Sequence, residues 1–154
     1  MNAVYKLMFV TSLFTILSPN EIWSHCEVPC GVYGDDARFL AMSEDVKTIE
    51  KAMNFINSLS EKSDAISANQ LARWVDTKEQ HASRIQHTVS QYFMTQRLKS
   101  SVDDEKDARN SYLNKLELLH RILRAAMVCK QTVDAENAHD MQALIDEFRI
   151  AYNK

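Results

Sequence analysis

Apolar residues recur at intervals of three and four along most of the chain, which is the spacing of one face of an α-helix. Four such stripes occur, and each predicts one amphipathic helix. The first consists of Phe39, Met42, Val46, Ile49, Met53 and Ile56. The second, with one polar interruption, consists of Leu71, Val75, Lys78, Ala82, Ile85, Val89 and Tyr92. The third consists of Tyr112, Leu116, Leu119, Leu123 and Ala126, widened by Leu113 and Ile122. The fourth consists of Ala138, Met141, Ile145, Phe148 and Tyr152.

Polar segments separate the stripes and predict the turns between the helices. Residues 58–64 are largely polar and follow the first stripe. The second helix is expected to end near Lys99. The acidic run 103–105 suits the first turn of the third helix, because carboxylates favour the positive end of the helix dipole. Thr132 or Asp134 can cap the fourth helix.

Glycine and proline, the two strongest helix breakers, are both absent after Gly34. Four amphipathic helices joined by short loops then predict an all-α fold, an antiparallel up-and-down four-helix bundle, over residues 35–154. An irregular segment, residues 25–34, precedes this bundle and contains both glycines of the chain. We call this segment the hook.

Composition narrows the class of protein. A chain of 154 residues has the size of one domain. The formal net charge is −3 and no dense basic block occurs, so nucleic acid is not expected as a partner. Three cysteines are too few for a disulfide scaffold. Of these, Cys129 falls on the third predicted helix and is expected to be a small buried hydrophobe.

Residues 1–24 have the layout of a cleaved leader. Lys6 precedes the apolar run Leu7–Leu17, and the small residue Ser24 stands directly before His25. This predicts a secretory signal peptide, which is too short to span a bilayer as a mature helix. The mature protein would then be exported to the periplasm, the extracellular space or an organelle lumen, with no membrane attachment. The alternative is a pro-segment that a dedicated protease removes in the cytoplasm. Either process leaves a new N-terminus at or near His25.

The hook reads His-Cys-Glu-Val-Pro-Cys-Gly-Val-Tyr from His25 to Tyr33. In a chain that begins at His25, the free amine, the Cys26 amide nitrogen and the Cys26 thiolate close two five-membered chelate rings on one metal ion. Cys30 can fill the fourth corner of the plane if Pro29 bends the chain. Two nitrogens and two sulfurs in a plane suit Ni(II) or Cu(II), whereas Zn(II) prefers a tetrahedron. The His25 imidazole could add an axial ligand.

Other uses of the hook remain open on the residues alone. A Cys26–Cys30 disulfide is plausible in an exported helical binding protein, and spacing by itself favours it over a metal site. A carrier that holds nickel or copper without redox chemistry is another possibility. A zinc site would need two more ligands, and the remaining histidines lie on predicted helices without an obvious pairing: His81, His87, His120 and His139.

The string from His25 to Tyr33, followed by a four-helix bundle, resembles the nickel-dependent superoxide dismutase family. The pattern His-Cys-x-x-Pro-Cys-Gly-x-Tyr is highly specific to that family, whose mature chains begin at this histidine. Residues 46–53 resemble the family's first helix, and residues 78–80 and 90–93 resemble its second. The resemblance reverses the preference for a disulfide and favours a metal site.

The resemblance implies an antioxidant enzyme that converts superoxide to dioxygen and hydrogen peroxide, with one nickel ion per chain alternating between Ni(II) and Ni(III). The implied ligands are the His25 amine and imidazole, the Cys26 amide and thiolate, and the Cys30 thiolate. Tyr33 matches a tyrosine whose hydroxyl faces the open side of the metal and helps to hold small anions and water. Tyr92 matches a second tyrosine that hydrogen-bonds near it. A homohexamer and a maturation protease are also implied.

Three positions depart from the family pattern. Leu40 stands where well-known members carry a glutamate that orients the axial imidazole, His81 replaces an arginine, and Met94 replaces a lysine. None of these changes touches a ligand. They bear instead on the support of the axial imidazole and on the electrostatic guidance of superoxide. We hypothesise that His81 takes over part of that support.

Overall fold

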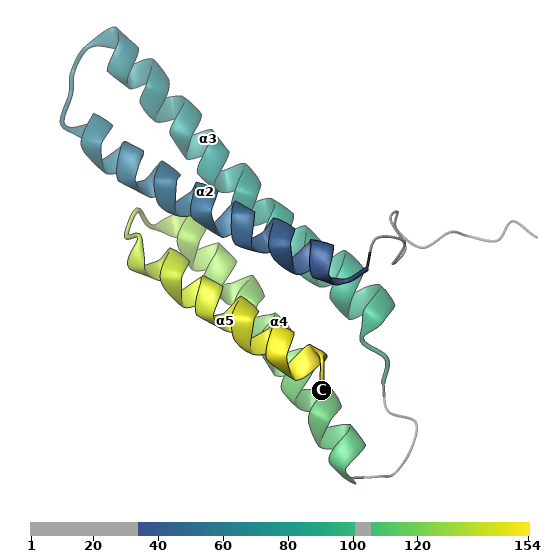
Figure 1. Ribbon diagram of the computed structural model, residues 1–154. Helices are drawn as coiled ribbons and strands as arrows, with labels where there is room; N and C mark the ends of the chain where they lie inside the picture. Colours follow the sequence, from purple (N-terminus) through teal and green to yellow (C-terminus); the bar gives the residue numbers. More distant parts are fainter. Residues whose placement is uncertain (1–33, 101–105) are drawn as a thin grey trace, which may run out of the picture.

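The computed structural model describes residues 34–100 and 106–154, and every regular element in these two ranges is helical (Figure 1). The leader, the hook ligands and the acidic run 103–105 lie outside the described residues. The elements are α2 (Asp36–Ser60), α3 (Ala65–His87), η1 (Thr88–Arg97), α4 (Lys106–Gln131) and α5 (Glu136–Tyr152). The element η1 is a π-helix that continues α3 without a break.

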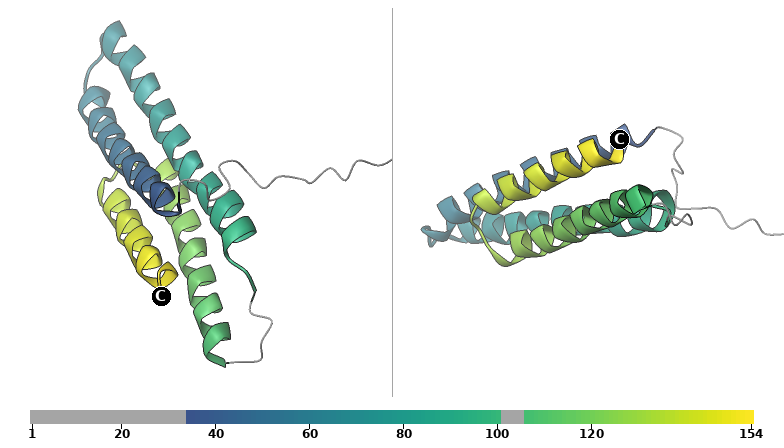
Figure 2. Two further views of the ribbon diagram at one scale, coloured as in Figure 1. Left: turned by 45° about the vertical axis from the view of Figure 1, so that its right-hand side comes forward. Right: turned by 90° about the horizontal axis from the view of Figure 1, so that it is seen from below.

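The helices form the predicted antiparallel four-helix bundle. Contacts join α2 to α3, α3 to α4, α4 to α5 and α5 back to α2, so neighbours in sequence are neighbours in space. The view from below in Figure 2 shows two layers, with α2 and α5 in one and α3 and α4 in the other. The fold class expected from the apolar pattern is therefore confirmed for the described residues.

The first and fourth stripes are confirmed as core faces. All six apolar residues of the first stripe are buried, and so are the first four of the last stripe. Cys129 is also fully buried, as expected for a small hydrophobe. Rings from three elements pack at one end of the core: Phe39, Phe93, Phe148 and Tyr152.

For the second and third stripes, the prediction of a buried face is wrong at some positions. Val75 is exposed, because it lies beside the loop between α4 and α5, where Thr132 and Val133 line an open pocket with it and no helix covers it. Leu113 is exposed as well, since the start of α4 extends past the end of α5. In its place α4 buries Leu118, which lies outside the predicted stripe.

A side-chain cap is seen at the start of α3, whereas the N-cap residues of α2 and α5 make no side-chain cap bond. Asp64 caps α3 by accepting from the backbone N–H groups of Ile66 at 3.0 Å and Ser67 at 2.9 Å. The N-cap of α5 is Ala135 and neither Thr132 nor Asp134, so that prediction is wrong by position, although Asp134 accepts from the N–H of Glu136 at 3.1 Å. The observed turn between α2 and α3 is shorter than predicted, because α2 continues to Ser60.

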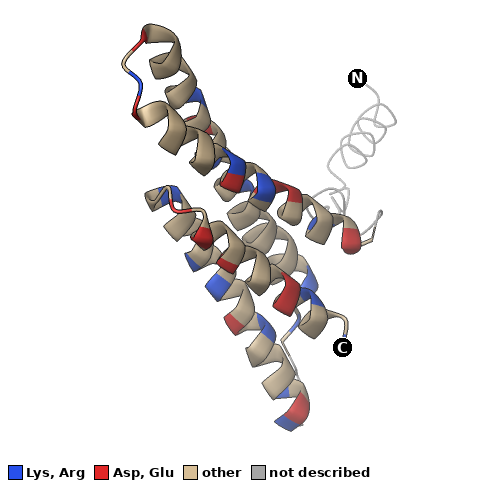
Figure 3. Ribbon diagram, turned by 60° about the vertical axis from the view of Figure 1, so that its left-hand side comes forward, with Lys and Arg blue, Asp and Glu red and all other residues tan. Residues whose placement is uncertain are grey.

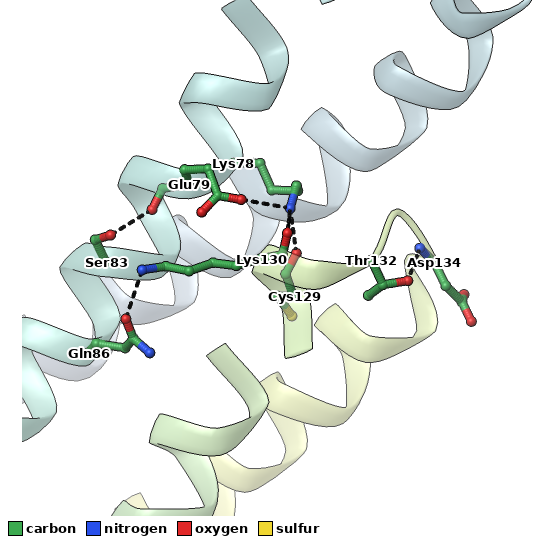
Figure 4. A network of polar contacts seen from close by, with 8 residues as sticks. All are labelled: Lys78, Glu79, Ser83, Gln86, Cys129, Lys130, Thr132 and Asp134. Carbon is green, nitrogen blue, oxygen red and sulfur yellow. Dashed lines mark hydrogen bonds and ion pairs between the residues drawn. The ribbon is translucent and has the colours of Figure 1, made fainter. Parts of the chain in front are cut away.

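A buried lysine closes the carboxyl end of α4 (Figure 4). The Lys78 ammonium donates to the carbonyl oxygen of Cys129 at 2.8 Å, to that of Lys130, and to a carboxylate oxygen of Glu79 at 3.1 Å. These carbonyls have no partner within α4, since they belong to its last turn. The polar interruption in the second stripe is therefore a contact between α3 and α4, which explains why a charged residue occupies a core position.

Basic and acidic residues are interspersed along the helices (Figure 3). No helix among the described residues is both long enough and apolar enough to cross a bilayer.

Candidate functional site

The hook joins the bundle through Gly34 and Asp35. Gly34 has φ of +75°, a left-handed conformation that costs glycine little and other residues more. Asp35 directly precedes α2, and its side chain turns back onto the bundle rather than capping its own helix. The ends of η1 and α5 meet it there, because Arg97 is the last residue of η1 and Tyr152 is the last of α5.

The Asp35 carboxylate accepts four hydrogen bonds from three side chains. The Tyr92 hydroxyl donates to Oδ1 at 2.5 Å, and the Tyr152 hydroxyl donates to Oδ2 at 2.6 Å. Arg97 donates to Oδ2 from Nη2 at 2.5 Å and from Nε at 3.1 Å. We call these four residues the Asp35 cluster. It contains Tyr92, the one predicted site residue that falls within the described ranges.

The charges within the Asp35 cluster are fixed near neutral pH. Burial alone would raise the pKa of the Asp35 carboxyl, but its three donors and the Arg97 charge outweigh burial and lower that pKa below its ordinary value. Burial, followed by the hydrogen bond to Asp35 and the Asp35 charge, raises the pKa of Tyr92 to about 12. Burial and the same carboxylate raise the pKa of Tyr152. Asp35 is therefore ionised, and both tyrosines keep their protons.

The π-helical geometry of η1 brings Tyr92 and Arg97 to the same carboxylate. In an α-helix, residues five apart lie about 140° apart around the axis. In a π-helix they lie much closer together around the axis, because each N–H bonds to the carbonyl five residues earlier. Thr95 follows this spacing and donates its hydroxyl to the carbonyl of Ser90 at 2.7 Å. The wide helix is thus what places both donors on one face.

Aromatic and basic groups surround Tyr92. Its ring packs edge-on against Phe93 with 5.3 Å between centroids, and the Arg38 guanidinium lies 5.7 Å from its centroid. The Tyr92 side chain is buried, and its hydroxyl bonds to Asp35. Packing and hydrogen bonding together hold Tyr92 in one orientation.

The three positions that depart from the family pattern lie in different surroundings. His81 on α3 has its Nδ1 at 2.6 Å from Oδ1 of Asp45 on α2, and Arg84 approaches the same oxygen at 3.8 Å. Burial raises the pKa of Asp45, although the bond to His81 opposes that shift. Leu40 is exposed, and Met94 packs against the core.

The predicted metal ligands His25, Cys26 and Cys30, and the predicted catalytic residue Tyr33, lie outside the described residues. Within residues 34–100 and 106–154, no group of three or more His, Cys, Asp or Glu side chains could hold a metal ion. The ligand assignment therefore stays a prediction from the sequence of the hook.

Sequence reasoning missed three members of the Asp35 cluster: Asp35, Arg97 and Tyr152. Their separations along the chain are long, up to 117 positions between Asp35 and Tyr152. The one local signal was an acidic residue directly after a glycine, at the junction between the hook and the first predicted helix.

Comparison with known families completes the description. A family model described as nickel-containing superoxide dismutase matches residues 20–154, a range that includes the hook and every described helix. No match was found among curated proteins, and none among solved structures.

Proposed function

Because the chain belongs to the nickel-containing superoxide dismutase family, we propose that residues 25–34 hold the nickel ion at which superoxide is disproportionated. Membership of this family makes the chain an oxidoreductase that acts on superoxide and uses nickel. The observation that carries the proposal is that the family match covers the hook with every expected donor present in the sequence.

The donor set of the hook fits nickel by its chemistry. The His25 amine and the Cys26 amide supply two nitrogens, and Cys26 and Cys30 supply two thiolates. The His25 imidazole would be the axial ligand. Borderline and soft donors of this kind favour nickel or copper over magnesium, calcium or manganese. Because the thiols and the amide must lose protons on binding, affinity for nickel should fall steeply on acidification.

Bound nickel would supply one-electron redox chemistry by alternating between Ni(II) and Ni(III). Two thiolates and an ionised amide are strong anionic donors, so they stabilise the higher oxidation state. The net reaction consumes two superoxide ions and two protons and yields one dioxygen and one hydrogen peroxide, which would protect the cell against oxidative stress. Tyr33 would help to hold small anions and water beside the hook.

The proposal requires a free amine at His25. We propose that a protease removes residues 1–24 as a signal peptide, which would make the mature protein an exported one. Support comes from the apolar run Leu7–Leu17 and from the small residue Ser24 directly before His25. Removal of a pro-segment in the cytoplasm would expose the same amine.

His81 is the proposed replacement for part of the support of the axial imidazole. Asp45 fixes the His81 ring through Nδ1, in the way that carboxylates orient imidazoles around metal sites. A His81→Ala variant should bind nickel as the wild type does and lose several-fold in activity per nickel. Unchanged activity per nickel would remove His81 from the proposed site.

The decisive experiment extends the mature N-terminus by one residue. An alanine placed before His25 removes the free amine from the chelate without changing any side chain. We expect this variant, and Cys26→Ser, to lose both nickel and activity. Cys129→Ser is the matched control, because Cys129 is buried in the bundle, and it should keep both.

Each alternative has its own outcome in the same experiment. A protein whose Cys26–Cys30 pair is a disulfide would show it in the intact mass of the native chain and would be indifferent to the added alanine. A nickel or copper carrier would bind metal while superoxide persists. A native chain that starts at His25, carries one nickel and has no disulfide supports the proposal.

A further inference from the structure

We propose that Asp35 is a positioning residue that fixes the direction of the Tyr92 hydroxyl and ties the junction of the hook to the ends of η1 and α5. The part of this proposal that concerns the hook rests on the proposed function. The part that concerns Tyr92 stands on the described contacts alone.

The Asp35 cluster gathers three elements at one carboxylate. Its donors are separated from Asp35 by 57 positions at Tyr92, 62 at Arg97 and 117 at Tyr152. Each donor comes from the end of an element or one turn before it, so the carboxylate closes this end of the bundle. Asp35 is also five residues after Cys30, which makes the cluster the nearest described anchor of the predicted ligands.

The direction of the Tyr92 hydroxyl follows from simple counting of protons. An ionised carboxylate can only accept hydrogen bonds, and a phenol has a single proton to donate. Since Tyr92 gives that proton to Asp35, its oxygen can offer only lone pairs to any other neighbour. Tyr92 can therefore accept from a water molecule or from another hydroxyl, but it cannot donate to an anion such as superoxide.

This assignment separates the roles of the two predicted tyrosines. An anion beside the hook needs a donor, and Tyr92 cannot be that donor while Asp35 holds its proton. Under the proposed function, Tyr92 instead orients a water molecule by accepting one of its protons, which leaves the second proton of that water for the anion. Asp35 thus acts on the reaction through Tyr92 and does not touch the substrate.

Asp36 provides a matched control one residue away. Its carboxylate is 72% exposed and accepts from Arg149 at 2.8 Å on the surface of the bundle. Replacement of either aspartate by asparagine removes one negative charge from the same region of the chain. Only the change at Asp35 removes the negative charge from the group that accepts the Tyr92 proton.

The first test needs no nickel. The phenol of Tyr92 is titrated by ultraviolet absorbance in the nickel-free chain. The absorbance of the same protein carrying Tyr92→Phe is subtracted at each pH, which leaves the signal of Tyr92 alone. In Asp35→Asn we expect the pKa of Tyr92 to fall from about 12 towards its ordinary value of 10.0, although burial keeps part of the shift. In Asp36→Asn the pKa of Tyr92 should remain at about 12. An unchanged Tyr92 pKa in Asp35→Asn would overturn the proposal.

The second test is a double-mutant cycle on the nickel-loaded chain. If Asp35 acts through Tyr92, Asp35→Asn and Tyr92→Phe should each lower activity per bound nickel by a similar factor, on the order of three- to ten-fold. The double variant should then lose no more than either single one. Losses that multiply in the double variant would assign Asp35 a purely structural role and overturn the positioning role.

Two further readouts keep the test decisive. If Asp35→Asn does not fold, Tyr152→Phe removes one donor while the bond from Tyr92 to Asp35 stays, and its Tyr92 pKa should remain near about 12. A fall of that pKa to its ordinary value in Tyr152→Phe would contradict the proposal. Failure of the proposed function would give a different result: the wild-type chain would bind no nickel, while its Tyr92 would still titrate with a pKa of about 12.

Discussion

Cys129 shows at the scale of one residue how burial decides whether a thiol reacts. Its side chain is fully buried on α4, and its sulfur lies 3.4 Å from the carbonyl oxygen of Asn137. Burial raises the pKa of Cys129 to about 11, although the nearby Lys78 charge opposes the shift. The thiolate is the reactive form, so Cys129 should survive beside a source of hydrogen peroxide.

The first prediction concerns this thiol. In the native protein at pH 8, Cys129 should resist both iodoacetamide and hydrogen peroxide over the time in which a thiol in an unfolded chain reacts completely. Peptide mass spectrometry gives the modified fraction. The urea-unfolded chain is the control, and equal labelling of the native and unfolded chains would contradict the prediction.

The second prediction concerns the pH dependence that Asp35 gives to stability. The folded-state pKa of Asp35 lies below its ordinary value of 3.8. A carboxyl of this kind stabilises the fold above its unfolded pKa, and that contribution disappears as pH falls through the folded pKa. Wild type should therefore be more stable than Asp35→Asn at pH 7, and the difference should shrink steadily below about pH 4.

Thermal unfolding between pH 7 and pH 2 measures this difference. Charged groups at this end also include Asp36, Arg38, Arg97, Lys99, Lys115 and Arg149, and Asp36→Asn controls for the general effect of one lost charge. A gap between wild type and Asp35→Asn that stays constant over this range would contradict the prediction.

At the scale of an element, α4 depends on a side chain from α3 to end properly. The Lys78 ammonium satisfies carbonyl oxygens of the last turn of α4 and brings a positive charge to the negative end of its dipole (Figure 4). Lys130, from α4 itself, bonds in return to the side chain of Gln86 at 2.9 Å. These two contacts tie α3 to α4.

The third prediction follows from that arrangement. Lys78→Met keeps the apolar stem but leaves buried carbonyl oxygens without a donor, which should lower the free energy of unfolding by about 1–3 kcal/mol. Lys130→Met is the control, because its partner is a side chain near the surface, and it should cost about 0.5 kcal/mol or less. Urea denaturation of the nickel-free proteins measures both, and equal costs would contradict the role of Lys78.

The apolar pattern predicted the helices but not the kind of helix in η1. The stripe through Val89 and Tyr92 continues at helical spacing, and these residues are buried as expected. The π-helical spacing lets Tyr92 and Arg97 both reach Asp35, which lies 57 and 62 positions away along the chain. The spacing of apolar residues does not distinguish an α-helix from a π-helix over so short a segment.

At the scale of the molecule, local patterns were predictable and long-range ones were not. The hook chemistry could be proposed because its expected donors lie between His25 and Cys30 and need no tertiary contact. The exposure of Val75 and Leu113 could not be predicted from the sequence, since it depends on where neighbouring helices and loops end. The Asp35 cluster was missed for the same reason, because it exists only after three distant segments have packed.

The fourth prediction concerns the assembly of several chains. We propose a homohexamer in which the hook ends of the bundles are covered, and two large apolar side chains near that end are well exposed in the single chain, Leu40 at 59% and Ile150 at 62%. Leu40→Lys should therefore shift the native mass below six chains in light scattering. Ile66→Lys is the control, as Ile66 is 76% exposed at the opposite end of the bundle, and it should leave the mass unchanged. The reverse pattern would place the interface at the other end.

The position of Tyr152 in the Asp35 cluster also sets an order of events during biosynthesis. Asp35 leaves the ribosome early, whereas its partner Tyr152 is made 117 positions later. The carboxylate cannot collect all its donors until synthesis has passed α5. Until then the junction at Gly34 and Asp35 lacks part of its anchor, so a hook that binds nickel as proposed would be tied to the bundle only after α5 has been made.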